Sequence, residues 1–98
     1  MVKRVSILGA TGSIGASALD LLRRDPSHYR VVALTAHRDA KKLAALAREF
    51  DAEIAAVADE KCHAELKDAL SGSRTRVLAG AGGVAEAASV DSDLVVAA

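Results

Sequence analysis

The stretch ILGATGSIG, residues 7–15, follows a short run of β-branched residues and opens a segment with helical periodicity. Its glycines stand at positions 9, 12 and 15, a spacing that differs from the more common Gly-x-Gly-x-x-Gly fingerprint. Gly9 allows a sharp exit from the strand, Gly12 allows a pyrophosphate to approach the backbone, and Gly15 allows close helix packing. This strand–turn–helix pattern predicts a dinucleotide-binding α/β fold.

The same turn offers hydrogen-bond donors to an anion. The backbone N–H groups of Gly12, Ser13 and Ile14 open the helix, where unpaired donors and the helix dipole favour phosphate. The hydroxyl groups of Thr11 and Ser13 add to them. The alternative interpretation is a turn that only reverses the chain and binds nothing.

Strand-like and helix-like segments alternate along the rest of the chain. We expect helices at 13–24, 40–50, 60–70 and 82–88, and strands at 2–8, 29–36, 53–58, 75–79 and 93–98. In the first helix we expect a buried face of Ile14, Ala18, Leu21 and Leu22. Such alternation predicts a Rossmann-like doubly wound parallel sheet with right-handed crossovers and helices on both faces.

The end of the second strand favours one form of the cofactor. NAD-binding domains place an Asp or Glu there for the ribose 2′-hydroxyl, whereas this chain has Thr35 and Ala36 followed by His37 and Arg38. A guanidinium matches the oxygens of a 2′-phosphate, so we expect NADP(H) to be preferred over NAD(H). The alternative interpretation is a solvated face in which Arg38, Lys41 and Lys42 bind nothing and Asp39 caps the next helix.

Nine residues are therefore candidates for cofactor binding, and none is a candidate for catalysis or metal binding. They are Gly9, Thr11, Gly12, Ser13, Ile14, Gly15, His37, Arg38 and Asp39. Cys62 and His63 are adjacent, which does not suit two ligands on one helix face. The segment Gly80–Gly83 follows a predicted strand, and it either lines the cofactor or forms a turn.

Composition excludes several classes of function. The 98 residues form one domain, and thirteen basic against thirteen acidic residues give no charge that would attract nucleic acid or an anionic membrane. No apolar run approaches the roughly 20 residues of a membrane span. A single cysteine fits a reducing, cytoplasmic environment. The sequence stops inside an apolar run at Val96–Ala98, so we expect an N-terminal fragment of a longer polypeptide.

The sequence resembles the 1-deoxy-D-xylulose 5-phosphate reductoisomerases, the NADPH enzymes of non-mevalonate isoprenoid biosynthesis. The resemblance extends over the whole chain and rests on segments 8–15, 19–20, 26–34, 36–38 and 77–78. It implies that Thr11, Gly12, Ser13 and Ile14 hold the pyrophosphate of NADPH. It further implies that His37 and Arg38 lie by the 2′-phosphate.

The chain also departs from that family. Asp39 stands where the family commonly has Asn, and a carboxylate there would repel a phosphate unless it turns inward as the helix cap. Segment 81–83 lacks the acidic residue expected there. The resemblance implies that the divalent-cation ligands and the substrate pocket belong to later parts of the polypeptide. A complete homodimeric enzyme would convert 1-deoxy-D-xylulose 5-phosphate to 2-C-methyl-D-erythritol 4-phosphate with NADPH and Mg²⁺ or Mn²⁺, whereas residues 1–98 would supply only the cofactor platform.

Two other classes of function remain open at this point. One is the NADP-binding domain of another Gly-x-x-Gly-x-x-Gly reductase, such as an extended short-chain dehydrogenase or a semialdehyde dehydrogenase. The other is a non-catalytic NADP(H) sensor. Ser13 stands where extended short-chain enzymes often have an aromatic or apolar residue, which favours the reductoisomerase interpretation.

Overall fold

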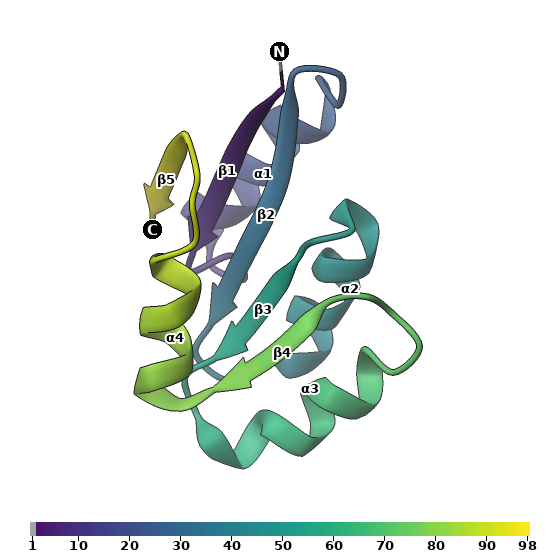
Figure 1. The fold of residues 1–98 in the computed structure, drawn as a ribbon, viewed down its shortest axis with the longest axis vertical. Coiled ribbons are helices and arrows are strands. Elements are labelled where there is room, and N and C mark those ends of the chain that lie inside the picture. Colours follow the sequence, from purple (N-terminus) through teal and green to yellow (C-terminus); the bar gives the residue numbers. More distant parts are fainter. Residues whose placement is uncertain (1) are drawn as a thin grey trace.

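A computed structural model describes residues 2–98 as a five-stranded parallel sheet with the strand order β4-β3-β2-β1-β5 (Figure 1). Met1, the first residue of the predicted domain, lies outside the described residues. The strands are β1 (Lys3–Leu8), β2 (Tyr29–Ala36), β3 (Ile54–Val57), β4 (Arg76–Ala79) and β5 (Leu94–Ala97). The helices are α1 (Ser13–Arg23), α2 (Ala40–Phe50), the 3₁₀ turn η1 (Glu60–Cys62), α3 (His63–Ala69) and α4 (Gly80–Ala88).

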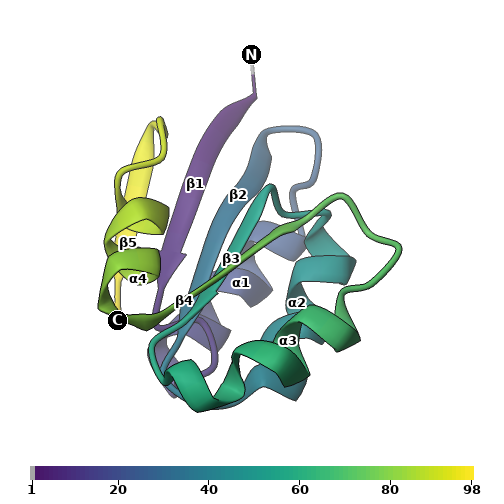
Figure 2. The ribbon, with the colours of Figure 1, turned by 60° about the horizontal axis from the view of Figure 1, so that its bottom comes forward.

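Helices cover both faces of the sheet, as predicted. The chain builds strands outward from β1 to β4 and then returns to the far side of β1 for β5. Right-handed crossovers therefore place α1, α2 and α3 on one face and α4 on the other (Figure 2). The doubly wound Rossmann-like fold is confirmed.

The core is built largely from small and β-branched residues. The six residues 31–36 of β2 are all buried, because this central strand has helices over both of its faces. Ile7 and Leu34 of the sheet pack in one cluster with Leu43 of α2, whereas Ala33 and Ile54 face α4. Alanines at such positions allow the helices to lie close to the sheet.

The predicted burial of α1 is partly wrong. Ile14 and Leu21 are each 65% exposed, and the face that meets the sheet carries Gly15, Leu19 and, partly buried, Leu22. These three are spaced four and three residues apart, so they share one side of the helix. Gly15 must face the turn that precedes the helix, because a Cβ there would overlap backbone atoms of Gly9, and this requirement fixes the rotation of α1.

Two predicted helix boundaries also differ from the structure. The helix expected at 60–70 is split, because the Asp59 carboxylate accepts a hydrogen bond from the Lys61 N–H at 3.0 Å and tightens the first turn into η1. The helix expected from residue 82 begins at Gly80, since Ala79 is the extended residue that precedes it. Segment 80–83 is thus the first turn of α4 and not a flexible loop.

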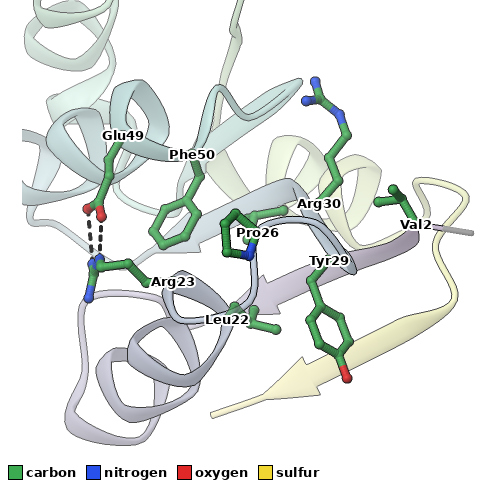
Figure 3. Close-up of a pocket in the computed structure, with 9 residues that line it drawn as sticks. Val2, Leu22, Arg23, Pro26, Tyr29, Arg30, Glu49 and Phe50 are labelled. Atoms are coloured by element: carbon green, nitrogen blue, oxygen red, sulfur yellow. Dashed lines mark hydrogen bonds and ion pairs between the residues drawn. The ribbon is translucent and has the colours of Figure 1, made fainter.

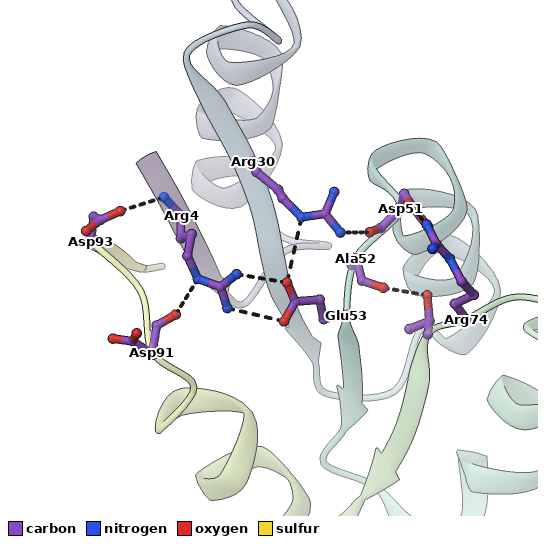
Figure 4. A network of polar contacts seen from close by, with 9 residues as sticks. Arg4, Arg30, Asp51, Ala52, Glu53, Arg74, Asp91 and Asp93 are labelled. Atoms are coloured by element: carbon purple, nitrogen blue, oxygen red, sulfur yellow. Dashed lines mark hydrogen bonds and ion pairs between the residues drawn. The ribbon is translucent and has the colours of Figure 1, made fainter. Parts of the chain in front are cut away.

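A polar network joins the amino ends of the strands (Figure 4). Arg4 in β1 donates two hydrogen bonds to the Glu53 carboxylate, at 2.9 and 3.2 Å. Its Nε donates to the Asp91 carbonyl at 2.9 Å, and its backbone N–H donates to the Asp93 carboxylate at 2.8 Å. The hydrogen bonds from Arg4 lower the pKa of Glu53, although partial burial opposes the shift. Arg4 thereby ties the segments that precede β3 and β5 to β1.

Candidate functional site

The glycine-rich turn leaves β1 at its carboxyl end and is held by the neighbouring strand. Gly9 has a φ of +84°, a conformation that favours glycine. Its N–H donates to the Thr35 hydroxyl at 3.0 Å, and the Ala10 N–H donates to the Thr35 carbonyl at 2.7 Å. Thr35 is buried at the end of β2, so this residue fixes where the turn begins.

The three glycines of the turn are required for different reasons. A Cβ on Gly15 would overlap the carbonyl oxygen of Gly9, and one on Gly9 would lie 2.9 Å from the Ala98 carbonyl oxygen. A Cβ on Gly12 would meet only the Gly9 carbonyl oxygen, at an ordinary 3.7 Å, and the φ of Gly12 is −82°. Packing therefore explains Gly9 and Gly15 but not Gly12, which is exposed at the start of α1.

The first turn of α1 carries free hydrogen-bond donors. Among the described residues, no acceptor pairs with the N–H groups of Ser13 and Ile14, and no side chain caps the helix. The expectation that the Gly12 N–H is also free is wrong, because it closes the tight turn by donating to the Gly9 carbonyl at 3.3 Å. The first turn contains no acidic residue, so no negative side chain in it competes with an anion for the positive end of the helix dipole.

A cavity of about 380 Å³ lies over this turn. It is lined by Gly9, Thr11, Gly12, Ser13, Ile14, His37 and Ala98. Six of the nine predicted residues thus share one cavity, while Gly15 lies beneath it and Arg38 and Asp39 do not line it. Ala98 was not predicted; its N–H donates to the Leu8 carbonyl at 2.9 Å, because β5 runs parallel to β1 and ends beside the turn.

Asp39 acts as the cap of α2. Its carboxylate accepts a hydrogen bond from the Lys42 N–H at 3.1 Å, which is the inward orientation considered from the sequence. Arg38 is largely exposed, and its Nε lies 3.8 Å from the Asp59 carboxylate, which follows β3. At that distance the pair is a loose surface contact.

Thr35 and Lys42 are not among the nine predicted residues, although both contact the glycine-rich turn. The Lys42 ammonium donates to the Thr11 carbonyl at 3.2 Å and so joins α2 to the glycine-rich turn. The signal for Thr35 was its place at the end of the second strand, where a hydroxyl can reach across to the first. The signal for Lys42 was its position one turn into the following helix.

A second hollow, of about 420 Å³, lies at the opposite end of the sheet (Figure 3). The only tyrosine and the only phenylalanine of the chain, Tyr29 and Phe50, both line it. Arg23 pairs with Glu49 on its rim and stands 5.3 Å from the centre of the Phe50 ring. Ligands of open α/β sheets bind at the carboxyl ends of the strands, so the cavity over the turn is the better candidate.

No three His, Cys, Asp or Glu side chains of residues 2–98 gather closely enough to hold a metal ion. None of the helices in that range combines the length and the apolar character that crossing a membrane requires.

Comparison with known sequences gives one family. Residues 5–98 match the 1-deoxy-D-xylulose 5-phosphate reductoisomerase family. The reductoisomerase of Afipia carboxidovorans is 56% identical over 94 residues, covering 96% of this chain and 23% of the relative. That of Zymomonas mobilis is 46% identical and covers 98% of this chain and 25% of the relative. The chain thus spans about a quarter of the length of these curated relatives.

Comparison with solved structures also gives 1-deoxy-D-xylulose 5-phosphate reductoisomerases. A reductoisomerase from Zymomonas mobilis in complex with NADPH has a TM-score of 0.94 and 44% identity, over 97% of this chain and 25% of that one. A reductoisomerase in complex with NADPH, fosmidomycin and magnesium has a TM-score of 0.88 and 37% identity, over 96% and 24%. These matches do not favour the short-chain dehydrogenase, semialdehyde dehydrogenase or sensor alternatives.

Proposed function

Because the chain belongs to the 1-deoxy-D-xylulose 5-phosphate reductoisomerase family, we propose that residues 1–98 form the NADPH-binding domain of such an enzyme. The observation that carries this proposal is the cavity over the glycine-rich turn. It combines unpaired amide donors at the start of α1 with a glycine, Gly12, that packing does not require. The similar Zymomonas mobilis structure is a complex with NADPH, which supports the same cofactor here.

The pyrophosphate of NADPH would lie against the first turn of α1. The N–H groups of Ser13 and Ile14 would donate to its oxygens, together with the hydroxyl groups of Thr11 and Ser13. The missing side chain of Gly12 would leave room for the phosphate, since Gly12 lines the cavity and carries no Cβ. Gly9 and Gly15 would contribute indirectly, by fixing the shape of the turn.

The adenosine ribose would lie where β2 ends. His37 lines the cavity, and Arg38 is the next residue along the chain. In place of the Asp or Glu whose carboxylate binds the 2′-hydroxyl of NAD, this strand has the uncharged Thr35. This end of the strand supports a preference for NADPH over NADH. Asp39 would lie nearby without repelling the phosphate strongly, because its carboxylate is engaged in capping α2.

The complete reaction requires more than this chain holds. NADPH supplies the hydride, and the complete polypeptide would isomerise and reduce 1-deoxy-D-xylulose 5-phosphate with the aid of Mg²⁺ or Mn²⁺. We place the cation ligands and the sugar-phosphate pocket outside residues 1–98, where hard carboxylate ligands can gather. We further propose a cytoplasmic location, which the single cysteine supports, and a homodimer of the complete polypeptide.

Titration of the purified chain with NADPH and with NADH tests the binding proposal. We expect NADPH to bind at least about tenfold more tightly, because a charged hydrogen-bond partner for the 2′-phosphate contributes about 1.5–3 kcal/mol. Equal affinity for the two cofactors would remove the 2′-phosphate site, and no affinity for either would refute the proposed function.

A separate assay tests whether residues 1–98 lack catalytic activity of their own. The chain, mixed with 1-deoxy-D-xylulose 5-phosphate, NADPH and Mg²⁺ or Mn²⁺, should show no substrate-dependent loss of NADPH absorbance. Steady turnover that persists after repurification would place a catalytic site within these 98 residues.

A further inference from the structure

Of the three cationic side chains that follow β2, Arg38 and Lys42 make contacts on opposite sides of that strand. The Arg38 guanidinium lies toward Asp59, which follows β3. The Lys42 ammonium instead donates to the Thr11 carbonyl, which follows β1. Since β2 lies between β3 and β1 in the sheet, these contacts point in opposite directions from the same strand end.

The cavity lies on the side that Lys42 faces. Thr11 lines it together with Gly12 and Ser13, and His37 lines it from the end of β2. Lys42 therefore stands at the border of the cavity and spans the gap between the glycine-rich turn and α2. Neither Lys42 nor Arg38 is itself among the lining residues, but the Lys42 ammonium contacts one of them, Thr11, whereas the Arg38 guanidinium lies toward Asp59.

The ammonium of Lys42 is available to an anion. It has three donors, and the Thr11 carbonyl accepts from one of them. Among the described residues no carboxylate forms an ion pair with it, whereas Arg38 has Asp59. The backbone of Lys42 is fixed by the Asp39 cap, so the side chain starts from a defined point on α2.

We propose that Lys42 binds the 2′-phosphate of NADPH and is a main determinant of the preference for NADPH over NADH. This inference rests on the proposed function. The ribose 2′ position of a bound dinucleotide lies at the end of the second strand, next to the glycine-rich turn, which is the gap that Lys42 spans. A dianionic phosphate is a far stronger acceptor than the Thr11 carbonyl. When the cofactor binds, the Lys42 ammonium would therefore donate its hydrogen bond to the phosphate and no longer to Thr11.

The test uses a neighbouring lysine as a matched control. Lys41 is exposed on the same turn of α2, and among the described residues its side chain has no hydrogen-bond or ion-pair partner. Lys42→Gln and Lys41→Gln remove the same charge, and Lys42→Arg keeps it. Dissociation constants for NADPH and NADH are measured by titration for each variant, with circular dichroism as a check on folding.

We expect Lys42→Gln to raise the dissociation constant for NADPH about tenfold and that for NADH less than about twofold. Lys41→Gln should change either constant less than about twofold, and Lys42→Arg should recover most of the NADPH affinity. Equal losses for NADPH and NADH would assign Lys42 to the turn or the pyrophosphate and overturn the inference. Equal changes in the dissociation constant for NADPH in Lys42→Gln and Lys41→Gln would also overturn the inference. A wild-type chain that binds neither cofactor would instead refute the proposed function itself.

Discussion

Gly15 lies directly against Gly9, so close that a Cβ on Gly15 would overlap the Gly9 carbonyl oxygen. The backbone of α1 therefore touches the backbone of the turn without any side chain between them. This contact sets the distance of α1 from β1 and the rotation of the helix about its axis. The free N–H groups of Ser13 and Ile14 owe their place at the cavity to it.

Gly15→Ala should destabilise the fold strongly, whereas Gly12→Ala should not. The added methyl group at position 15 has to displace backbone atoms of Gly9 and Ala10, so we expect the free energy of unfolding to fall by about 2–3 kcal/mol or more. At position 12 the methyl group meets only an ordinary contact, and the weaker helix cap costs less than about 1 kcal/mol. Urea unfolding of both variants provides the measurement. Similar losses for the two would show that the contact at Gly15 relaxes easily.

Gly12→Val should abolish binding of NADPH in a chain that still folds. The branched side chain would fill the space that the pyrophosphate needs, while its Cβ meets only one described atom of the protein, at 3.7 Å. Circular dichroism should remain like that of the wild type, and a titration should detect no NADPH binding. Wild-type affinity in this folded variant would place the cofactor elsewhere.

The sequence predicted the backbone of the site well because its determinants are local. Glycine spacing, a preceding β-branched strand and a following amphipathic helix are sufficient to predict a turn at residues 9–12 and a helix from Ser13. The capping role of Asp39 was likewise local, since the donor comes from Lys42 three residues later. The doubly wound sheet followed from the alternation of elements and the handedness of crossovers.

Contacts between distant segments could not be predicted in this way. The place of Ala98 beside the turn leaves no pattern in the sequence, and the bond from Gly9 to Thr35 is marked only by the position of Thr35 at the end of β2, because both contacts depend on the strand order. The exposure of Ile14 and Leu21 was missed for a related reason. Hydrophobic spacing gives the width of an apolar face, whereas the backbone contact at Gly15 decides which face turns inward.

Two replacements of Asp39 should distinguish the effect of its helix cap on stability from the effect of its charge on NADPH binding. Asp39→Ala removes the acceptor for the Lys42 N–H and should lower the free energy of unfolding by about 1 kcal/mol. Asp39→Asn keeps an acceptor of equal quality and removes a negative charge near the proposed phosphate. We therefore expect wild-type stability and roughly twofold tighter NADPH binding in the Asn variant, by an effect that salt weakens. Weaker NADPH binding by Asp39→Asn would mean that the carboxylate takes part in the site.

The Glu53 carboxylate should make stability depend on pH in the acidic range. Its pKa in the folded chain is lowered by the hydrogen bonds from Arg4, so below the ordinary glutamate value of 4.5 the unfolded chain takes up a proton first. The stabilisation is thus complete above that value and is lost as the pH falls through the lower folded pKa. Glu53→Gln should show a smaller loss of stability between about pH 7 and about pH 3. Glu49, whose pKa is lowered by its hydrogen bond with Arg23, remains as a second contributor.

Urea midpoints of the wild type and Glu53→Gln across that range provide the measurement. Glu49→Gln serves as the matched comparison, because its partner Arg23 lies on a helix and not between strands. Parallel pH profiles for the wild type and Glu53→Gln would contradict the assignment.

The exit of β1 and the end of β5 both contribute to the cavity over the turn, since Gly9 and Ala98 line it and lie close to each other. During synthesis Gly9 is made early, whereas Ala98 is added 89 residues later. On the proposed function, the binding surface is complete only after β5 has docked beside β1, so nucleotide binding would report that docking step. Free cofactor at a hundred times its dissociation constant would add about 2.7 kcal/mol to the assembled state. The concentration of free nucleotide would then change the yield of folded protein.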